Sequence, residues 1–245
     1  MEWQTLERQL GDCFFDIAAE CPYGLPYKAI YRQALFGPIP DHTMDGFLAA
    51  GFRRNGNTMY TMVCRECQSC VPIRLDPEEF TPNRGQRRTL ARNQDLTVTT
   101  GPLQITPDRL ALCDAFLNTR YPGRHSTALD YYSGFFVNAV TNTMEVAYRL
   151  DGRLVGVAIV DVTLASLNAV YFYFDPAMSA SSLGTFNILH LLELCQREDK
   201  DFLYLGYWID AVPAMRYKAR FKPHFLLRGQ IWRRVDRGEP SAERP

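Results

Sequence analysis

The stretch EVAYRLDGRLVGVAIVDV, residues 145–162, contains two β-branched runs joined by Asp151-Gly152. An Asp-Gly pair between two such runs is a strong hairpin signal, because both residue types tolerate the positive φ angles of a tight turn. The stretch therefore predicts an antiparallel hairpin of strands 145–150 and 153–162, and the rest of the second half can be placed around it.

The flanking segments alternate between helices and strands. Helices are expected at 107–120, 128–142 and 183–197, and further strands at 167–174, 202–207 and 230–235. A hairpin, a third strand, a helix and a parallel fourth strand is the order of elements in the acyltransferase core of the GNAT fold. We therefore expect an α+β protein with a GNAT-like acyltransferase core.

The first half reads differently. A helix is expected over Asp41–Gly51, with Asp41 or Thr43 as its N-cap, followed by a hairpin around Asn55-Gly56-Asn57. Residues 71–75 are expected to be extended, and residues 84–93 to form an arginine-rich helix. We place a domain boundary near residue 80: residues 1–80 form a smaller, cysteine-bearing α/β region, and residues 81–245 carry the GNAT-like core.

The charge balance of the 245 residues hides a strong polarisation. Lys+Arg and Asp+Glu both number 27, and 47% of the residues are hydrophobic, which excludes a disordered, a fibrous and a uniformly basic protein. Yet residues 84–92 hold four arginines and residues 211–235 hold seven Lys/Arg, both without an acid. Each run alone is as well explained by a solvated face, but together they favour a shared polyanion-binding surface.

No membrane or targeting segment is visible, so we expect a cytoplasmic protein without a membrane partner. An odd number of cysteines, seven, fits a reducing compartment.

Three cysteines form the cluster Cys64-x-x-Cys67-x-x-Cys70 directly after a predicted strand. Tetrahedral zinc and iron–sulfur clusters need four ligands, and Cys21, in a turn of the same region, is the best fourth candidate. We expect a structural zinc ion or iron–sulfur cluster here. Incidental loop cysteines, or a redox-active C-x-x-C without metal, are the alternatives.

Two segments are unusually aromatic, YFYFDP (171–176) and LYLGYWID (203–210). Tyr171 and Tyr173 should share one face of their strand. Tyr207 and Trp208, next to Gly206, fit a strand that splays from its neighbour, where an aromatic cleft would stack a base or seat an apolar side chain.

Two further segments suit anionic groups. Ser182 and Gly184 open the 183–197 helix, whose free N–H groups suit phosphate or carboxylate. If residues 215–222 (MRYKARFK) are extended, their four basic side chains lie on one side and form a stripe that follows a phosphate backbone: Arg216, Lys218, Arg220 and Lys222. The alternative is an exposed edge strand whose basic residues prevent edge-to-edge pairing.

These segments together resemble the aminoacyl-tRNA–protein transferases of the N-end rule pathway, in their short bacterial branch. The similar motifs are Cys21-Pro22-Tyr23, Gly51-Phe52-Arg53-Arg54-x-Gly56, the cysteine cluster, Phe80-x-Pro82-x-Arg84-x-Gln86-Arg87-Arg88, Tyr171-x-Tyr173-x-Asp175-Pro176, Ser182-Leu183-Gly184-Thr185, Tyr204-Leu205-Gly206-Tyr207-Trp208-Ile209 and Met215-x-Tyr217-Lys218-Ala219-x-Phe221-x-Pro223. The chain departs from the family at Thr61-Met62-Val63, Val212 and His224.

The resemblance implies transfer of an amino acid from aminoacyl-tRNA to the α-amine of proteins that begin with Asp or Glu, which marks them for degradation. The short bacterial branch donates leucine from leucyl-tRNA, and the longer eukaryotic branch donates arginine. The transfer itself requires no cofactor. An arginyl donor, a small-molecule GNAT N-acyltransferase and a non-enzymatic metal or redox sensor remain as alternatives.

Under that interpretation, each candidate residue has a role. Arg87 and Arg88 bind tRNA phosphate, Ser182 and Gly184 support anion binding, and Tyr173 and Trp208 line the site for the terminal adenosine and the donor side chain. Arg53, Arg54, Lys218 or Arg220 reads the acidic side chain of the acceptor. Tyr171, Tyr207 and Tyr217, with Lys218, form the catalytic set that orients the substrates or relays a proton.

Overall fold

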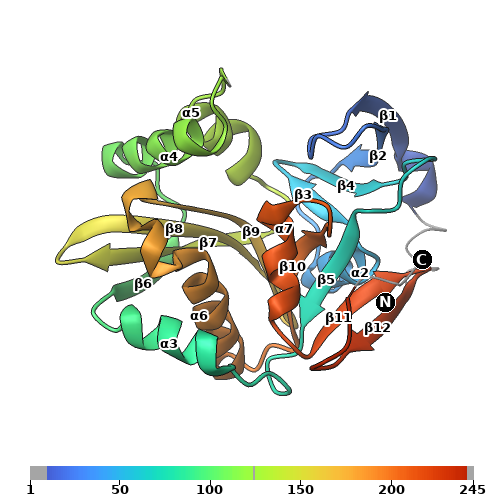
Figure 1. The fold of residues 1–245 in the computed structure, drawn as a ribbon. Helices are drawn as coiled ribbons and strands as arrows, with labels where there is room; N and C mark the ends of the chain where they lie inside the picture. Colours follow the sequence, from blue (N-terminus) through green and yellow to red (C-terminus); the bar gives the residue numbers. More distant parts are fainter. Residues whose placement is uncertain (1–9, 124, 242–245) are drawn as a thin grey trace.

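The computed structural model describes residues 10–123 and 125–241. Within them the chain forms a mixed α+β fold with a four-stranded sheet, order β1-β2-β4-β3, and an eight-stranded sheet, order β12-β11-β5-β10-β9-β8-β7-β6 (Figure 1). The strands are β1 (Phe15–Glu20), β2 (Lys28–Leu35), β3 (Arg53–Asn55), β4 (Thr58–Met62), β5 (Val71–Leu75), β6 (Thr97–Pro102), β7 (Asn142–Leu150), β8 (Arg153–Val162), β9 (Ser166–Phe174), β10 (Phe202–Trp208), β11 (His224–Arg228) and β12 (Ile231–Val235). The helices are α2 (Asp41–Ala49), α3 (Arg84–Arg92), α4 (Pro107–Arg120), α5 (Ala128–Tyr131), α6 (Leu183–Arg197) and α7 (Pro213–Arg216), with short helical turns η1 (Gly11–Cys13), η2 (Tyr132–Phe136), η3 (Pro176–Ser181) and η4 (Tyr217–Arg220).

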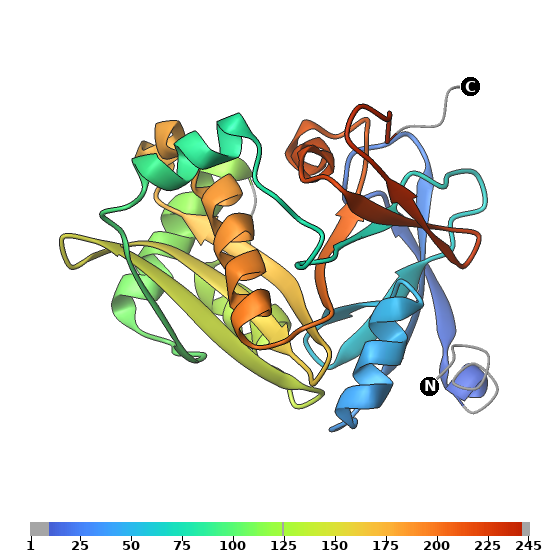
Figure 2. The ribbon, with the colours of Figure 1, turned by 90° about the horizontal axis from the view of Figure 1, so that it is seen from below.

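Two lobes lie side by side in Figures 1 and 2. The first lobe is the four-stranded sheet with α2. The second lobe is the sheet portion β6–β9, with α3 and α6 on one face and α4 and α5 on the other. Strand β10 runs between them and leads the large sheet on into β5, β11 and β12.

The hairpin predicted around Asp151-Gly152 is confirmed. Strands β7 and β8 pair antiparallel and close at Leu150 opposite Arg153, and both turn residues have positive φ. Strand β9 pairs antiparallel with β8, and β10 pairs parallel with β9, as the element order predicts. The core on the α6 side of this sheet includes Val155, Leu191 and Leu203.

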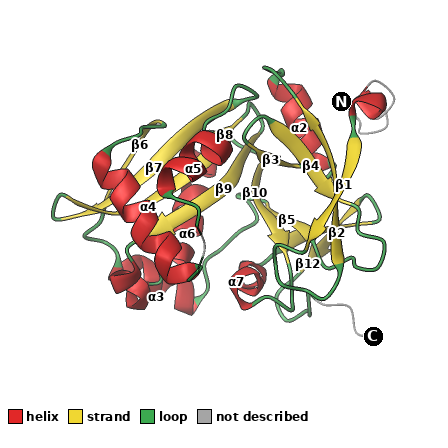
Figure 3. Cartoon of the chain, turned by 90° about the horizontal axis from the view of Figure 1, so that it is seen from above, coloured by secondary structure: helices red, strands yellow, loops and turns green. Residues whose placement is uncertain are grey.

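The parallel pairing of β9 and β10 is short. It ends at Asn168 opposite Tyr204, and β10 then bulges between Tyr204 and Tyr207. Gly206 at this bulge has φ +82°, a backbone conformation that glycine adopts at little cost. We call the point where the two strands part the β9–β10 fork. Strands β3 and β4 of the first lobe lie beside it (Figure 3).

In the first lobe the predicted Asn55–Asn57 hairpin is also confirmed, with Asn55 opposite Thr58. Helix α2 forms where predicted, but the N-cap predicted for it, Asp41 or Thr43, is wrong. The N-cap is Pro40, whose carbonyl accepts from the N–H groups of Thr43 and Met44, so no Asp or Thr side chain caps this helix.

Strands β2, β6 and β11 are not expected from the sequence. The helix expected over 128–142 is only α5 and η2. Strand β5 lies in the large sheet between β10 and β11. The division at residue 80 stays a prediction.

The predicted phosphate-tracking stripe is wrong. Residues 213–220 form α7 and η4 instead of a strand, with Pro213 at the first helical position. Helical turns point alternate residues to different sides, so Arg216 and Arg220 are exposed while Lys218 turns inward.

Among residues 10–123 and 125–241, none of the helices has the length and apolar character that a bilayer crossing requires.

Candidate active site at the strand fork

Arg53 reaches from the first lobe into the β9–β10 fork. Its Nη2 donates to the carbonyl of Ala169 at 3.1 Å, the first β9 residue after the pairing with β10 ends. The guanidinium also lies against Gly206, where a Cβ would approach Nη2 to 3.0 Å. Arg53 therefore sits where the two strands part, and Gly206 leaves it room.

Lys218 approaches the same point from η4. Its Nζ donates to the carbonyl of Tyr207 at 2.9 Å. Burial and the nearby Arg53 guanidinium lower the pKa of Lys218 to about 7, because both disfavour the charged ammonium. The predicted residues Arg53, Tyr207 and Lys218 are thus brought together.

Three phenols surround this pair of basic groups. The Tyr207 hydroxyl donates to the Gly51 carbonyl at 3.4 Å. Burial raises the pKa of Tyr207, of Tyr60 and of Tyr23, while Arg53 opposes the rise at each, so all three lie within its field and stay neutral. The functional part of the sequence reasoning missed Tyr23 and Tyr60. Tyr60 lies opposite Arg53 in the β3–β4 hairpin, so the register of the predicted hairpin could have identified Tyr60 as a neighbour of Arg53.

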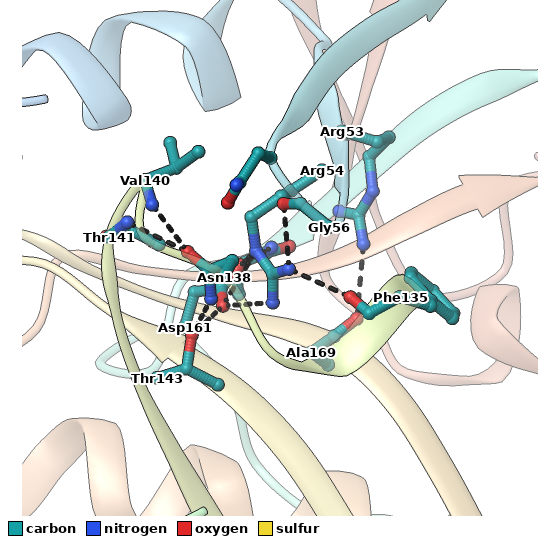
Figure 4. Close-up of polar contacts among 12 residues, drawn as sticks. Arg53, Arg54, Gly56, Phe135, Asn138, Val140, Thr141, Thr143, Asp161 and Ala169 are labelled. Carbon is teal, nitrogen blue, oxygen red and sulfur yellow. Dashed lines mark hydrogen bonds and ion pairs between the residues drawn. The ribbon is translucent and has the colours of Figure 1, made fainter. Parts of the chain in front are cut away.

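Arg54, the next residue, points the other way. Its guanidinium forms a fully buried ion pair with Asp161 at 2.7 Å, and its Nη1 donates to the carbonyls of Gly56 and Phe135 (Figure 4). This assigns Arg54 an interior position that joins the two lobes, away from any exposed surface.

The tyrosines of β9 lie apart from the fork. Tyr171 and Tyr173 do share one face, as predicted, and both pack into the aromatic cluster under α4 and η2. The Tyr173 hydroxyl is buried against that of Tyr132, and burial raises the pKa of both phenols. Trp208 is only 3% exposed and packs in the main core. The structure therefore does not present Tyr173 or Trp208 as an open stacking surface.

Tyr217 and Arg220 flank Lys218 in η4. Tyr217 packs on the main core, and burial raises its pKa to about 12 although Arg120 lowers it. The Arg220 backbone carbonyl accepts from Gln86 Nε2 at 3.3 Å. This bond ties η4, and with it Lys218, to the arginine-rich helix α3.

Helix α3 presents an open basic surface. Asn83 and Gln86 form a reciprocal capping box at its start. Its four arginines are exposed and, within the described part of the chain, form no ion pair: Arg84, Arg87, Arg88 and Arg92.

The start of α6 adjoins the end of α3. Arg92 Nη1 donates to the Ala180 carbonyl at 2.6 Å, and the Asn93 amide donates to the Ser181 carbonyl at 2.9 Å. Ser182, with φ 55°, is the N-cap of α6 and makes no side-chain cap bond, and Gly184 lies in the first helical turn. The predicted anion-binding residues of α3 and α6 are therefore neighbours.

The four candidate cysteines line one pocket of about 440 Å³, at the side of the first lobe near β11. Burial and the thiols of Cys64, Cys21 and Cys67 raise the pKa of Cys70 to about 12, so the four sulfurs lie within one electrostatic neighbourhood. Cys64 Sγ accepts from the Ile30 N–H at 3.4 Å, and Cys67 Sγ contacts Ser69 Oγ at 3.3 Å.

Four thiols are a donor set that suits zinc or an iron–sulfur cluster. In the described residues, however, no three His, Cys, Asp or Glu side chains are arranged as a metal-binding group. The structure thus gathers the predicted ligands in one pocket without setting them in coordination geometry.

Comparisons with known proteins match both halves of the chain. The family model described as "Arginine-tRNA-protein transferase, N terminus" matches residues 19–88, and "Arginine-tRNA-protein transferase, C terminus" matches residues 108–228. The aspartate/glutamate leucyltransferase of Thiobacillus denitrificans is 38% identical over 200 residues, which cover 81% of this chain and 83% of that protein. The chain belongs to the aminoacyl-tRNA–protein transferase family.

Other relatives agree with this assignment. The aspartate/glutamate leucyltransferase of Gluconacetobacter diazotrophicus is 36% identical and covers 89% of this chain and 85% of that protein. The resemblance inferred from the sequence motifs is confirmed, and this transferase is an enzyme of that family. The match to a solved structure of L-PGS from Bacillus licheniformis covers 72% of this chain and 53% of that chain at 13% identity, with a TM-score of 0.44.

Proposed function

We propose that this transferase moves leucine from leucyl-tRNA to the N-terminal Asp or Glu of proteins and thereby marks them for degradation. The observation that carries the proposal is the meeting of Arg53 and Lys218 at the β9–β10 fork in a member of this family. Relatives at 36–38% identity are named aspartate/glutamate leucyltransferases, which favours leucine as the donor and Asp or Glu as the acceptor.

Arg53 reads the acidic side chain of the acceptor. Its guanidinium is permanently charged and offers a planar fork of N–H groups that matches a carboxylate. Nη2 holds the Ala169 carbonyl, which fixes the side chain and leaves other N–H groups for the substrate. The neutral phenols of Tyr23 and Tyr60 add hydrogen-bonding partners beside it.

Lys218 takes the proton of the acceptor's α-ammonium. With a pKa of about 7, about half of its amine is neutral at pH 7, and an α-ammonium with a pKa of about 7.7–8.0 is well matched to it. The freed α-amine attacks the ester carbonyl carbon of the aminoacyl-tRNA, a C–N bond forms and the ester C–O bond breaks. A second proton passes from nitrogen to the departing ribose oxygen.

No covalent enzyme intermediate is needed, because the ester is already activated. The protein's contribution is alignment of amine and ester, together with stabilisation of the tetrahedral oxyanion. Tyr207, whose backbone carbonyl accepts from Lys218 Nζ, is assigned to the oxyanion through its phenol, while Tyr217 orients the segment that carries Lys218. Tyr171 supports β9 from the aromatic cluster.

The donor tRNA binds over α3 and the start of α6. Arg87 and Arg88 are exposed there, and Ser182 and Gly184 stand at the neighbouring helix start. Gln86 links this surface to η4, so the helix that binds tRNA also holds the segment that carries Lys218.

We propose a GNAT-like core for the second lobe on the order of its strands and the parallel β9–β10 pair, and a cytoplasmic location because aminoacyl-tRNA is made there.

The cysteine pocket would hold a structural zinc ion or iron–sulfur cluster through Cys21, Cys64, Cys67 and Cys70. Bound there, such a group would cross-link the loops that carry the four thiols.

The test is transfer from charged tRNA to peptides that differ only in their first residue. We expect leucine to be transferred to Asp- and Glu-starting peptides, with little transfer to their Asn- and Gln-starting isosteres, because Arg53 recognises a charge. Removing a charge-assisted hydrogen bond costs about 1.5–3 kcal/mol, so Arg53→Ala should lower kcat/KM about 10- to 100-fold.

Arginyl-tRNA serves as the second donor in the same assay, and acetyl-CoA binding by calorimetry tests a small-molecule acyltransferase. Transfer of arginine in preference to leucine would overturn the donor assignment. Tight acetyl-CoA binding without transfer from tRNA would overturn the proposed function.

A further inference from the structure

A buried ion pair fastens the first lobe to the second directly behind Arg53. Arg54 Nη2 donates to Asp161 Oδ1 at 2.7 Å, and Nε lies 3.0 Å from Oδ2, with both side chains fully buried. Asp161 receives two further hydrogen bonds, from the Thr143 hydroxyl at 2.7 Å and the Asn168 amide at 3.0 Å (Figure 4). The carboxylate is therefore held in one orientation by its own lobe.

Consecutive residues of β3 contact neighbouring strands of the other lobe. Arg54 binds Asp161 on β8, and Arg53 binds the carbonyl of Ala169 on β9. Asp161 pairs with Asn168 in the β8–β9 register, one residue before Ala169. Because side chains alternate along a strand, fixing Arg54 on one face of β3 fixes where Arg53 leaves the other face.

We propose that Asp161 is a positioning residue for acceptor recognition: by holding Arg54 it fixes β3, and so keeps the Arg53 guanidinium at the β9–β10 fork. This rests on the proposed function, in which Arg53 reads the acceptor. A buried ion pair is weak support for stability by itself, because desolvation offsets much of the attraction. Its place between the lobes gives it this specific task.

The chain offers a matched control. Arg109 and Glu145 form a second buried arginine–carboxylate pair, with Nε 2.9 Å from Oε1 and side chains 8% and 4% exposed. This pair joins α4 to β7 within the second lobe. Asp161→Asn and Glu145→Gln therefore remove the same kind of charge from the same kind of site, and only one of these sites supports Arg53.

The experiment measures leucine transfer to an Asp-starting peptide, with KM for peptide and for leucyl-tRNA determined separately, and Tm alongside. We expect both variants to lower Tm, but only Asp161→Asn to raise the peptide KM, by about tenfold, because small misplacements of a substrate-binding group are costly. The KM for leucyl-tRNA should stay unchanged. Selectivity for Asp- over Asn-starting peptides should fall in Asp161→Asn alone.

A double-mutant cycle separates an effect exerted through Arg53 from a general loss of stability. In an Arg53→Lys background, Asp161→Asn should change the peptide KM by less than about twofold, because the group it acts through is already altered. If Asp161→Asn does not fold, Thr143→Val removes only one hydrogen bond to the carboxylate and should raise the peptide KM in the same direction by a smaller factor.

Two results overturn the inference while the proposed function stands: equal peptide KM in Asp161→Asn and Glu145→Gln, or full additivity of Asp161→Asn with Arg53→Lys. Failure of the unmodified protein to transfer leucine from tRNA is a different result, and it overturns the proposed function together with this inference.

Discussion

At the scale of single residues, two neighbours in sequence can lie in different environments. Arg53 and Arg54 are chemically identical, and both were candidates for reading the acceptor. One lies at the β9–β10 fork and the other is wholly enclosed with Asp161. The hairpin could be predicted from Asn55–Asn57, and alternation along its first strand puts the two arginines on opposite faces. Which face meets the fork depends on the packing of the two lobes, and no local pattern carries that information.

Lys218 gives a pH prediction at this scale. Its amine must be neutral to accept a proton, so kcat/KM should rise with pH through about 7, where the lowered pKa of Lys218 lies. Lys218→Arg cannot deprotonate in this range, so it should lose this limb and transfer about 10²- to 10⁴-fold more slowly. The measurement is a rate profile of leucine transfer from about pH 6 to about pH 9.

Lys222 on the same segment is the control, since its Nζ binds the Asp236 carbonyl at 3.3 Å, away from the fork. Lys222→Ala should keep the profile of the unmodified enzyme. A Lys218→Ala variant that transferred leucine to Asp- and Glu-starting peptides at the normal rate would remove Lys218 from the mechanism.

At the scale of elements, strong local signals were reliable and weak ones were not. The Asp151-Gly152 hairpin and the arginine-rich helix follow from turn residues and capping chemistry within a few residues. The segment 215–222 alternates basic and apolar residues, which is typical of a strand, yet it forms α7 and η4. In the helical conformation Lys218 bonds to the Tyr207 carbonyl and the Arg220 carbonyl accepts from Gln86. These two inward contacts stabilise the helical turn over an extended segment.

Helix α3 carries a salt prediction. Each arginine that neutralises a tRNA phosphate releases counterions. The kcat/KM for leucyl-tRNA should therefore fall steeply as the salt concentration rises. Arg87→Ala with Arg88→Ala should weaken tRNA binding and reduce the slope of log kcat/KM against log salt concentration by about 2.

Arg32 is the matched arginine for that experiment, because it is exposed on the first lobe and paired with Asp16 at 2.9 Å. Arg32→Ala should leave the salt slope unchanged. If the double variant also kept the slope of the unmodified enzyme, α3 would not be the tRNA surface.

At the scale of the whole molecule, the cysteine pocket shows what sequence spacing can and cannot foresee. The spacing of Cys64, Cys67 and Cys70 predicts a metal site, and the turn around Cys21 makes it the fourth candidate ligand. The structure places all four in one pocket, together with Leu227 and Gly229 from the far end of the chain. That last contribution depends on the sheet order around β5, which no local signal encodes.

A structural metal at this pocket makes a prediction about stability. Purified protein should carry zinc or iron, measured by elemental analysis and a visible spectrum. Cys64→Ser should lower the metal content and lower Tm by at least about 3 °C, with kcat for leucine transfer at permissive temperature unchanged.

Cys13 is exposed and lies outside the pocket, so Cys13→Ser should retain both metal content and Tm. Equal metal content and Tm in the two variants would rule out a structural metal held by Cys64.

The position of β5 bears on how the protein is made. This strand leaves the ribosome early, yet both of its neighbours in the sheet, β10 and β11, are synthesised near the end of the chain. Until residues 202–228 emerge, β5 has neither edge paired, and an unpaired apolar strand is a ready partner for other nascent chains. We therefore expect translation that stalls before β10 to release a product that chaperones retain, however well the β7–β8 hairpin has already formed.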